Sequence, residues 1–230
     1  MMNVYHSIDE VPDTGEMNVT LTLGFFDGVH IGHKKVLDRL GEFHEPGTQV
    51  TGVVTFDRHP SEVFTPERAL GLLTTQEEKL AFLGKFKISY VLVIPFDTHF
   101  ASIPAWDFIE KILVGKLNVR HIVAGYDTRF GRGREGDVKM LEEAGKTSYF
   151  TVESILPVKF GDIAISSTAI RNSLLKGDVH SAQAMLGRPY TITGSVAKGE
   201  RLGTKLGFPT ANIAVPLRKI VPANGVYAAW

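Results

Sequence analysis

Short apolar segments rich in β-branched residues alternate with amphipathic helical patterns along most of this chain. Two strands joined by a helix usually run parallel, because the helix carries the chain back across the sheet. A parallel sheet is buried on both faces, so its strands read as continuous apolar runs. The alternation therefore predicts an α/β fold, with a parallel sheet covered by helices on both faces. We expect strands at residues 17–26, 49–56, 90–96, 119–127 and 149–158, and helices at residues 32–43, 74–86, 103–117 and 139–146.

The pattern changes near residue 187. Residues 167–187 look helical, and after them Tyr, Thr, Ile and Val alternate with glycines and prolines, which predicts an all-β unit. We therefore expect one unit over residues 1–186 and a second over residues 187–230, bridged by the helical stretch. Because about forty residues seldom bury a sufficient core alone, we expect the second unit to be the beginning of a larger β domain.

The charge and cysteine counts exclude several kinds of partner and site. Lys and Arg number 25 and Asp and Glu number 25, so long-range attraction to nucleic acid or to an acidic membrane is not favoured. The chain has no cysteine, which rules out disulfides, thiolate nucleophiles and cysteine-based metal sites. The N-terminal residues lack the features of a signal peptide, and no apolar run is long enough to span a bilayer. We expect a cytoplasmic protein that acts on small molecules, with neither nucleic acid nor membrane as partner.

Two local patterns are specific enough to predict contacts. Thr75 precedes an expected helix and Glu78 follows three residues later, which is the spacing of a capping box. The segment LGFFDGVHIGHK, residues 23–34, lies where the first strand gives way to a helix. His30 and His33 stand three residues apart in it, so their imidazoles can donate to the same anion as the free N–H groups of the helix start.

This segment predicts a site for a nucleoside triphosphate. Gly32 would allow a ligand to approach the backbone closely, and the partial positive charge of a helix N-terminus attracts anions. One alternative is a pair of surface histidines in a turn. A zinc site is a weaker alternative, because no third ligand stands at metal spacing.

Four motifs resemble those of prokaryotic FAD synthetases, within the nucleotidylyltransferase superfamily. GFFDGVHIGH (residues 24–33) resembles the HxGH signature, and TFDRHP (residues 55–60) resembles the second motif of the family. VAGYDTRFGRGREGD (residues 123–137) resembles a glycine- and arginine-rich loop, and ISSTAIR (residues 165–171) matches the closing motif. The motifs run in the family's order between residues 21 and 187. The resemblance implies a Rossmann-like nucleotidylyltransferase domain.

The resemblance implies that the FMN phosphate attacks the α-phosphorus of ATP, giving FAD and pyrophosphate without a covalent enzyme intermediate. Such transfer depends on alignment and on donors that spread negative charge. The motifs imply that His30 and His33 stabilise the α- and β-phosphates and that Arg171 holds the leaving β- and γ-phosphates. Ser167 and Thr168 would donate hydroxyl and backbone N–H groups, although both are also ordinary helix-capping residues. The residues expected to bind ATP are Gly24, Phe25, Phe26, Asp27, Gly28, Gly32 and Arg134.

The second and third motifs supply the residues expected to bind FMN. Arg58 stands where the family usually has proline, and Thr128 where it usually has an aromatic residue. Core packing is the alternative role for Phe56, a turn carboxylate for Asp127, and an exposed loop for Arg134. The residues expected to bind FMN are Phe56, His59, Pro60 and Asp127.

Residues 199–213 resemble the start of a riboflavin kinase module, which follows the adenylyltransferase in bifunctional members of the family. By this resemblance Thr210 and Asn212 are ligands of Mg²⁺ and nucleotide, since hydroxyl and amide oxygens are hard donors. Gly199 and Gly203 would belong to a phosphate-binding loop, and a glycine-rich β-hairpin is the alternative. The family's catalytic base lies further downstream, so we do not expect these residues alone to phosphorylate riboflavin.

Two other functions stay open. A related adenylyltransferase would act on another phosphate, such as that of a nicotinate or pantetheine substrate, but residues 55–60 and the FPTAN segment at 208–212 argue against it. A non-catalytic flavin-nucleotide sensor would keep the pocket without turnover, but the intact phosphate donors argue against that. Formation of FAD from FMN and ATP in the presence of Mg²⁺ distinguishes among the three functions.

Overall fold

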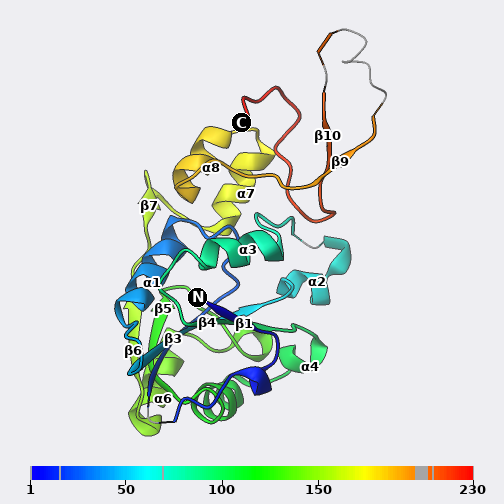
Figure 1. Cartoon of the computed structure of the whole chain (residues 1–230). Coiled ribbons are helices and arrows are strands. Elements are labelled where there is room, and N and C mark those ends of the chain that lie inside the picture. The colour runs from blue at the N-terminus through cyan, green and yellow to red at the C-terminus, as the bar shows by residue number, and fades with distance from the viewer. Residues whose placement is uncertain (1, 16, 69, 200–206, 209, 230) are drawn as a thin grey trace.

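A six-stranded sheet in the order β1-β4-β3-β2-β5-β6 forms the centre of the molecule, and every neighbouring pair of strands is parallel (Figure 1). The parallel α/β fold predicted from the sequence is thereby confirmed. The structure is a computed structural model that describes residues 2–15, 17–68, 70–199, 207–208 and 210–229. The strands of the sheet are β1 (Asn3–Tyr5), β2 (Asn18–Leu23), β3 (Gln49–Phe56), β4 (Tyr90–Ile94), β5 (Val119–Gly125) and β6 (Thr151–Ile155).

The four helices predicted within the α/β unit are present close to the predicted positions, whereas the short helices at Pro60–Phe64 and Thr98–Ala101 were not predicted. The capping box is confirmed, because Thr75 Oγ1 accepts a hydrogen bond from the Glu78 N–H at 3.2 Å and the Glu78 carboxylate accepts one from the Thr75 N–H at 3.0 Å. The helical stretch predicted over residues 167–187 forms two helices that meet at Gly177, whose φ of +77° favours glycine. The helices are α1 (Ile31–Glu42), α2 (Pro60–Phe64), α3 (Gln76–Leu83), α4 (Thr98–Ala101), α5 (Ala105–Asp107), the π-helix η3 (Phe108–Val114), α6 (Val138–Ser148), α7 (Ser167–Leu175) and α8 (Val179–Leu186), with 3-10 turns η1 (Ile8–Glu10), η2 (Pro66–Arg68) and η4 (Arg132–Arg134).

Each face of the sheet has its own hydrophobic core, because successive residues of a strand point to opposite faces. Val91 and Val93 of β4 pack in one core with buried side chains of α1 and α3. Leu92, which lies between them, packs in the other core with buried side chains of η3 and α6. Figure 1 shows α1 and α3 on one side of the sheet and α6 on the other. The continuous apolar run of β4 is therefore explained by burial on both faces.

The carboxyl ends of β2 and β5 meet where the strand order changes direction. From β2 the chain adds β3 and β4 on one side, and it then crosses over to add β5 and β6 on the other. Ligands of open parallel sheets bind in the crevice at such a switch point. β2 ends at Leu23, before the predicted limit at residue 26, and residues 24–30 form a turn that leads into α1. This turn lies at the switch point.

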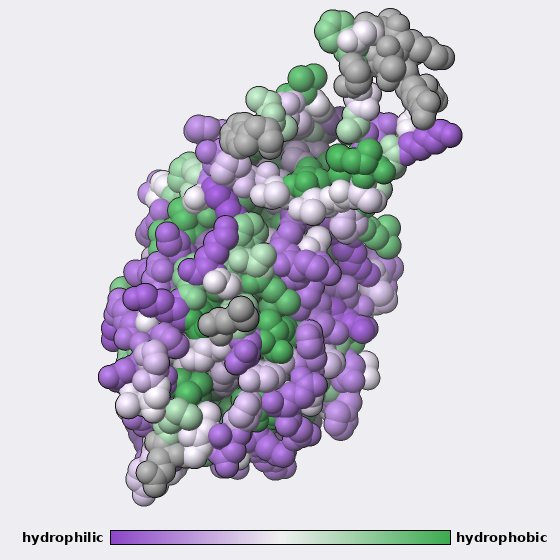
Figure 2. Space-filling view, viewed as in Figure 1, coloured by the Kyte–Doolittle hydropathy of each residue, from purple (hydrophilic) through white to green (hydrophobic). Residues whose placement is uncertain are grey.

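The residues after α8 form a hairpin and then return to the α/β unit. β9 (Ser195–Ala197) pairs antiparallel with β10 (Asn212–Ala214), and this hairpin projects from the body (Figure 1). On the face shown in Figure 2, hydrophobic residues gather near its base while hydrophilic residues cover much of the rest. A second short hairpin, β7 (Lys159–Phe160) with β8 (Ile163–Ala164), follows β6. Within the described residues, no helix has the length and apolar character that crossing a bilayer requires.

Residues 218–220, here called the strap, connect the C-terminal part of the chain to the α/β unit. Lys219 forms a parallel β-bridge with Leu72, where the Leu72 N–H donates to the Arg218 carbonyl at 2.7 Å and the Ile220 N–H donates to the Leu72 carbonyl at 2.9 Å. The Ile220 side chain is buried in a core with α7 and α8. Lys219 Nζ is buried and donates to the Leu73 carbonyl at 2.7 Å. The strap thus adds a strand-like contact to residues 71–73.

Candidate active site

A cleft of about 410 Å³ opens at the carboxyl ends of β2, β3 and β5 and at the first turn of α7. All five residues expected to be catalytic line it, namely His30, His33, Ser167, Thr168 and Arg171. Most of the residues expected to bind ATP and all four expected to bind FMN line it as well. Segments that are more than a hundred residues apart in sequence therefore meet in one place, as the switch-point rule requires.

The turn between β2 and α1 has an unusual backbone. Phe26 and Val29 have positive φ angles of 56° and 39°, a region that costs a non-glycine residue about 1–3 kcal/mol, and Gly28 has a φ of 80°. A Cβ at position 28 would lie 2.8 Å from the Leu73 side chain, so glycine is required there for space as well. Such a turn persists only where neighbouring groups hold it.

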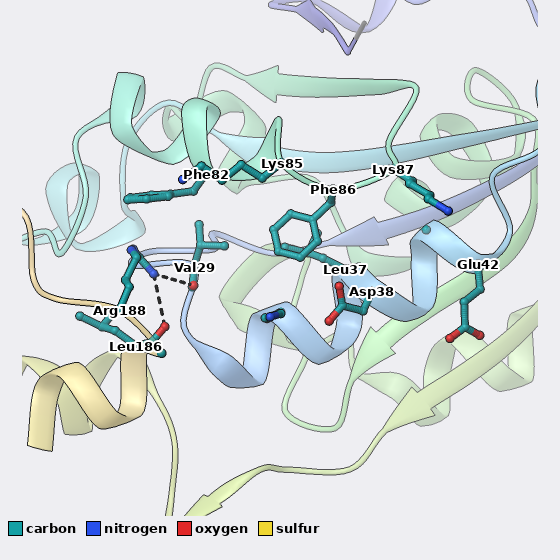
Figure 3. A pocket seen from close by; sticks show the side chains of 13 residues that line it. Val29, Leu37, Asp38, Glu42, Phe82, Lys85, Phe86, Lys87, Leu186 and Arg188 are labelled. Atoms are coloured by element: carbon teal, nitrogen blue, oxygen red, sulfur yellow. Dashed lines mark hydrogen bonds between the residues drawn. The ribbon is translucent and has the colours of Figure 1, made fainter.

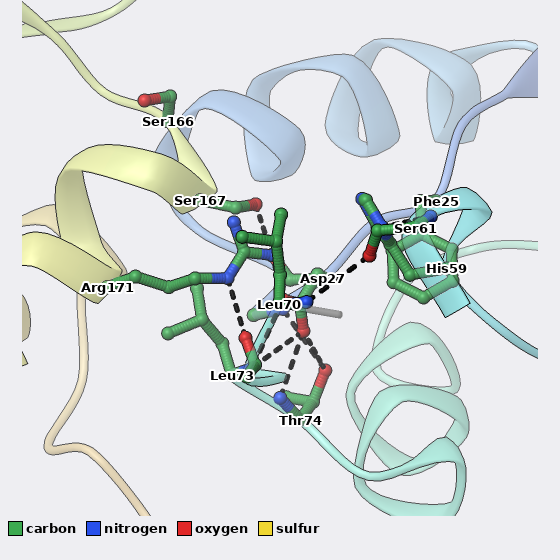
Figure 4. A network of polar contacts seen from close by, with 12 residues as sticks. Phe25, Asp27, His59, Ser61, Leu70, Leu73, Thr74, Ser166, Ser167 and Arg171 are labelled. Atoms are coloured by element: carbon green, nitrogen blue, oxygen red, sulfur yellow. Dashed lines mark hydrogen bonds and ion pairs between the residues drawn. The ribbon is translucent and has the colours of Figure 1, made fainter. Parts of the chain in front are cut away.

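Asp27 is one of the groups that hold this turn. Its buried carboxylate accepts hydrogen bonds from the Leu73 N–H at 2.9 Å, the Thr74 N–H at 3.0 Å and the Thr74 hydroxyl at 3.1 Å. The guanidinium of Arg171 donates to it at 2.6 Å (Figure 4). We expected Asp27 to bind ATP, but its carboxylate oxygens are taken by protein donors. The Asp27 side chain braces the turn rather than offering itself to nucleotide.

Arg171, which we expect to hold the leaving phosphates, is buried and hydrogen-bonded within the protein. The residue is only 6% exposed, and its Nε–H donates to the Gly71 carbonyl at 2.7 Å in addition to the bond with Asp27. Arginine has five N–H groups, and two of them make these contacts. Arg171 therefore links α7, the turn after β2 and residues 71–74 while its side chain still lines the cleft.

The two histidines lie against one another at the start of α1. Their rings are stacked, with centroids 3.6 Å apart and an interplanar angle of 17°. His30 is the N-cap of α1, and its Nδ1 accepts a hydrogen bond from the His33 N–H at 3.2 Å. A Cβ at Gly32 would lie 3.1 Å from the His30 ring, so glycine at this position makes room for the imidazole. Gly32 also lines the cleft, so the expectation that it lets a ligand approach the backbone stays a prediction.

Both imidazoles are neutral near pH 7 in the free protein. Burial, with the positive charges of Arg188 and Arg171, lowers the pKa of His30 to about 4. Burial, with the neighbouring His30 and Lys79, lowers the pKa of His33 well below its usual value. Because Nδ1 of His30 accepts a hydrogen bond, its ring proton is on Nε2. His30 can therefore donate through Nε2–H to an anion in the cleft.

This burial predicts an acid-sensitive fold. Unfolded His30 titrates near pH 6.5 and folded His30 near 4, so between these values the unfolded state binds more protons and stability is lost as the pH falls. We expect His30 alone to lower the free energy of unfolding by about 2 kcal/mol between pH 7 and pH 5, with His33 acting in the same direction. Urea unfolding at the two pH values measures this difference.

The control for this prediction is the variant His30→Asn, which can cap the helix but does not titrate. It should lose the share of the pH dependence that belongs to His30, and adding His33→Gln should remove the remainder that belongs to the pair. The same decrease in stability in wild type and in the double variant would contradict the assignment.

In the first turn of α7, the residue that caps the helix is Ser166, and not Ser167 or Thr168. Ser166 is the N-cap, since its Oγ accepts a hydrogen bond from the Ala169 N–H at 3.2 Å. The Ser167 hydroxyl donates to the Asp27 carbonyl at 2.9 Å and so ties α7 to the turn after β2 (Figure 4). Thr168 lines the cleft beside it. The helix start of α7 thus faces the same space as the helix start of α1.

Most of the residues expected to bind FMN line the cleft around the end of β3. His59 is the N-cap of α2, accepting a hydrogen bond from the Ser61 N–H at 3.1 Å, and its ring lies edge-on to Phe25 at 4.9 Å. Phe56 lines the cleft and also packs against Phe96 and Phe100. Arg58 does not line the cleft; its side chain is 57% exposed and lies 3.5 Å from Asp57.

Of the three arginines in the loop at residues 129–134, Arg129 and Arg134 line the cleft and Arg132 does not. Arg134 lines the cleft with a φ of +63°, whereas Arg129 also pairs with Asp137 at 2.8 Å. Asp137 is the N-cap of α6, so this ion pair anchors the end of the loop. Asp127 and Thr128 line the cleft at the end of β5.

One buried side chain next to the cleft residues was not singled out from the sequence. Lys79 of α3 is 3% exposed, and its Nζ donates to the Phe56 carbonyl at 2.8 Å and to the Thr55 hydroxyl at 3.2 Å. It also lies 4.4 Å from the centre of the Phe25 ring, and burial lowers the pKa of Lys79 to about 8. Lys79 therefore ties the ends of β2 and β3 together beneath the cleft. The only sequence feature that could have indicated the burial of Lys79 is its position four residues before the buried Leu83, on the same face of α3.

Three of the residues expected in the kinase module, Gly199, Thr210 and Asn212, do not line this cleft. Thr210 and Asn212 are exposed beside or within the β9–β10 hairpin, and Gly199 follows β9 closely. A Cβ on Gly199 would collide with the Asn212 side chain at 1.9 Å, as in the hairpin alternative. Gly203 lies outside the described residues. Across the described part of the chain, no cluster of three or more His, Cys, Asp or Glu residues could hold a metal ion.

Comparison with known proteins gives two family matches and close relatives. The family model described as FAD synthetase matches residues 13–169, and the one described as riboflavin kinase matches residues 186–230. A bifunctional riboflavin kinase/FMN adenylyltransferase of Escherichia coli K12 is 41% identical over 97% of this chain and 70% of its own length. One of Pseudomonas fluorescens with the same name is 40% identical over 90% of this chain and 66% of its own length.

A solved structure agrees with the fold. The crystal structure titled macrolide-efflux protein from Streptococcus pneumoniae has a TM-score of 0.84 and 28% sequence identity, and it covers 98% of this chain and 73% of that chain. The two family matches include the motifs at residues 24–33, 55–60, 123–137 and 199–213, and the first match ends within the motif at residues 165–171.

Proposed function

The chain belongs to the FAD synthetase family, and we propose that the cleft at the carboxyl ends of β2 and β5 is where it joins ATP and FMN. It is an enzyme of the FMN adenylyltransferase class, with the beginning of a riboflavin kinase module at its C-terminal side. The products of adenylyl transfer are FAD and pyrophosphate. The word efflux describes only the Streptococcus pneumoniae protein whose structure is similar. The family matches and the relatives are named for flavin nucleotides.

The reaction needs no residue to become covalently bound. An oxygen of the FMN phosphate forms a bond to the α-phosphorus of ATP, and the bond from that phosphorus to the bridging oxygen breaks, so pyrophosphate leaves with the bonding electrons. The enzyme must hold both phosphates in line and stabilise the charge on the leaving group. Hydrogen-bond donors fixed before the substrate arrives do this without further reorganisation.

The observation that carries the proposal is the stacked pair of neutral imidazoles at the start of α1, facing the start of α7 across the cleft. His30 and His33, with the free N–H groups of α1, would donate to the α- and β-phosphates. Thr168 and the remaining N–H groups of Arg171 would hold the β- and γ-phosphates. Ser167 would act through its bond to the Asp27 carbonyl as well as through its backbone N–H.

On the flavin side, His59 and Pro60 at the start of α2, with Asp127 at the end of β5, would position the FMN phosphate and ring. Phe56 would contribute an apolar wall. Arg134 would approach the triphosphate from the loop before α6, and Gly24 would let the backbone approach ATP. These roles rest on the position of each residue at the wall of one cleft, whereas Gly28, also expected to bind ATP, does not line it.

The module boundaries and the metal are part of the same proposal. We assign residues 1–186 to adenylyl transfer and residues 187–230 to the start of the kinase module. Mg²⁺ would accompany ATP, with Thr210 and Asn212 as its hard ligands in the kinase module and Gly199 and Gly203 in its phosphate loop. A cytoplasmic location fits a reaction among soluble nucleotides.

The test is incubation of the protein with FMN, ATP and Mg²⁺, followed by chromatography for FAD and an assay for pyrophosphate. We expect equal amounts of FAD and pyrophosphate. Tight FMN binding without FAD would favour a flavin-nucleotide sensor instead. Turnover only with a nicotinate or pantetheine phosphate would favour an adenylyltransferase for that substrate.

A further inference from the structure

Arg188 lies just after α8 and reaches the back of the turn that carries His30. Its Nη2–H donates to the Gly28 carbonyl at 2.6 Å, and its Nη1–H donates to the Val29 carbonyl at 3.1 Å. Figure 3 shows the bond to Val29 and a further bond from the same Nη1 to the Leu186 carbonyl at 3.4 Å, with the guanidinium lying beside Phe82. The guanidinium carbon is 3.7 Å from the centre of that ring. Arg188 is thus fixed between α3 and the turn after β2.

The two carbonyls that Arg188 binds belong to the strained part of the turn. Gly28 and Val29 have φ angles of 80° and 39°, and His30 follows directly. The direction of the Val29 carbonyl sets the plane of the peptide that enters His30. A planar fork with two parallel N–H groups matches two adjacent carbonyls, whereas an ammonium group cannot hold both in one geometry.

The charge of Arg188 acts on the same histidine. The charged and titratable groups around His30 are Arg188, Arg171 and the stacked His33, and the two arginines help to keep the pKa of His30 low. Lys79 acts on His33 in the same direction. A neutral His30 keeps its Nδ1 as the acceptor that caps α1 and its Nε2–H as a donor toward the cleft.

We propose that Arg188 is a positioning residue for adenylyl transfer, which holds the turn at residues 28–29 so that His30 presents Nε2–H to the phosphates. The inference rests on the proposed function of the cleft. Arg188 lies in the segment that matches riboflavin kinase, outside the segment that matches FAD synthetase. The part of the chain related to the kinase therefore supplies a side chain on which the transferase site depends.

The test compares Arg188→Met and Arg188→Lys with wild type in the full chain. Misplacement by about 1 Å can cost roughly 10²-fold in rate, so we expect Arg188→Met to lower kcat for FAD formation by about 10²-fold, with smaller changes in KM for ATP and FMN. Arg188→Lys should retain an intermediate rate, because an ammonium reaches one carbonyl. Lys87→Ala is the matched control, since this exposed cation lines the same surface pocket as Arg188 and should keep the wild-type rate.

A second measurement separates positioning from simple stability. NMR titration of the His30 imidazole should show a higher pKa in Arg188→Met than in wild type, and the acid limb of the rate profile should move to higher pH. Wild-type kcat in Arg188→Met, or a loss that equals the unfolded fraction, would overturn the proposal. If Arg188→Met does not fold, wild-type kcat and an unchanged His30 titration in Arg188→Lys would overturn it. If wild type itself forms no FAD, the proposed function fails, and the His30 titration still reports whether Arg188 controls this turn.

Discussion

Asp27→Ala is expected to lower the free energy of unfolding by about 3–5 kcal/mol, because removing one partner of a buried ion pair leaves the other charge uncompensated. Arg171 would keep its charge at 6% exposure, and the N–H groups of Leu73 and Thr74 would lose their acceptor. Adenylyl transfer should be lost as well, since the strained turn after β2 would be released. Urea unfolding with a check that the m-value is unchanged measures the first effect.

The matched control is Asp38→Ala, which removes an exposed carboxylate from the neighbouring helix α1 and should change stability by no more than about 0.5 kcal/mol. The double variant Asp27→Ala with Arg171→Met should be more stable than Asp27→Ala alone, because it removes the buried unpaired charge. A cost below about 1 kcal/mol for Asp27→Ala would mean that the pair is solvated and does not brace the turn.

His33→Ala is expected to lower kcat by about 10²–10³-fold, the usual effect of removing one donor aimed at a developing charge. The binding of FMN should change much less, because the residues proposed to bind FMN lie mainly at β3 and α2 while His33 lies in the first turn of α1. Rapid-quench measurement of FAD formation, with FMN affinity from fluorescence, separates the two quantities.

His99→Ala is the control for this variant, since His99 is exposed and does not line the cleft. The ring of His33 also packs against His30 and Phe26, so the alternative to a catalytic role is a purely structural one. That role would appear as a lower melting temperature with unchanged turnover per folded molecule, and this result would remove His33 from the mechanism.

The fold and the location of the site could be predicted because they depend on local patterns. The apolar runs of β3 and β4 mark buried strands, and the capping box at Thr75 marks the start of α3. The location of the site at the turn after β2 follows from the rule that ligands bind at the carboxyl ends of parallel strands. The motif resemblance then placed His30, His33 and Arg171 at this edge, and the structure brings all three to one cleft.

The contacts behind the cleft could not be predicted, because they join residues far apart in sequence. Asp27 reads as a turn residue, and only the fold shows that its carboxylate meets Leu73, Thr74 and Arg171. Lys79 and Arg188 read as ordinary charged residues, yet both donate to backbone carbonyls around the turn after β2. Periodicity indicates which face of a helix is buried, but it does not indicate which distant group that face meets.

The strap has a consequence for how the molecule is made. Its Ile220 completes the core of α7 and α8, and its Lys219 supports the residues that receive Asp27 and Arg171. The strap is synthesised long after β2 and α1, so its contacts with Leu72 and Leu73 form only after residues 218–220 have left the exit tunnel of the ribosome. A fragment that ends before residue 218 would lack these contacts and the buried side chain of Ile220.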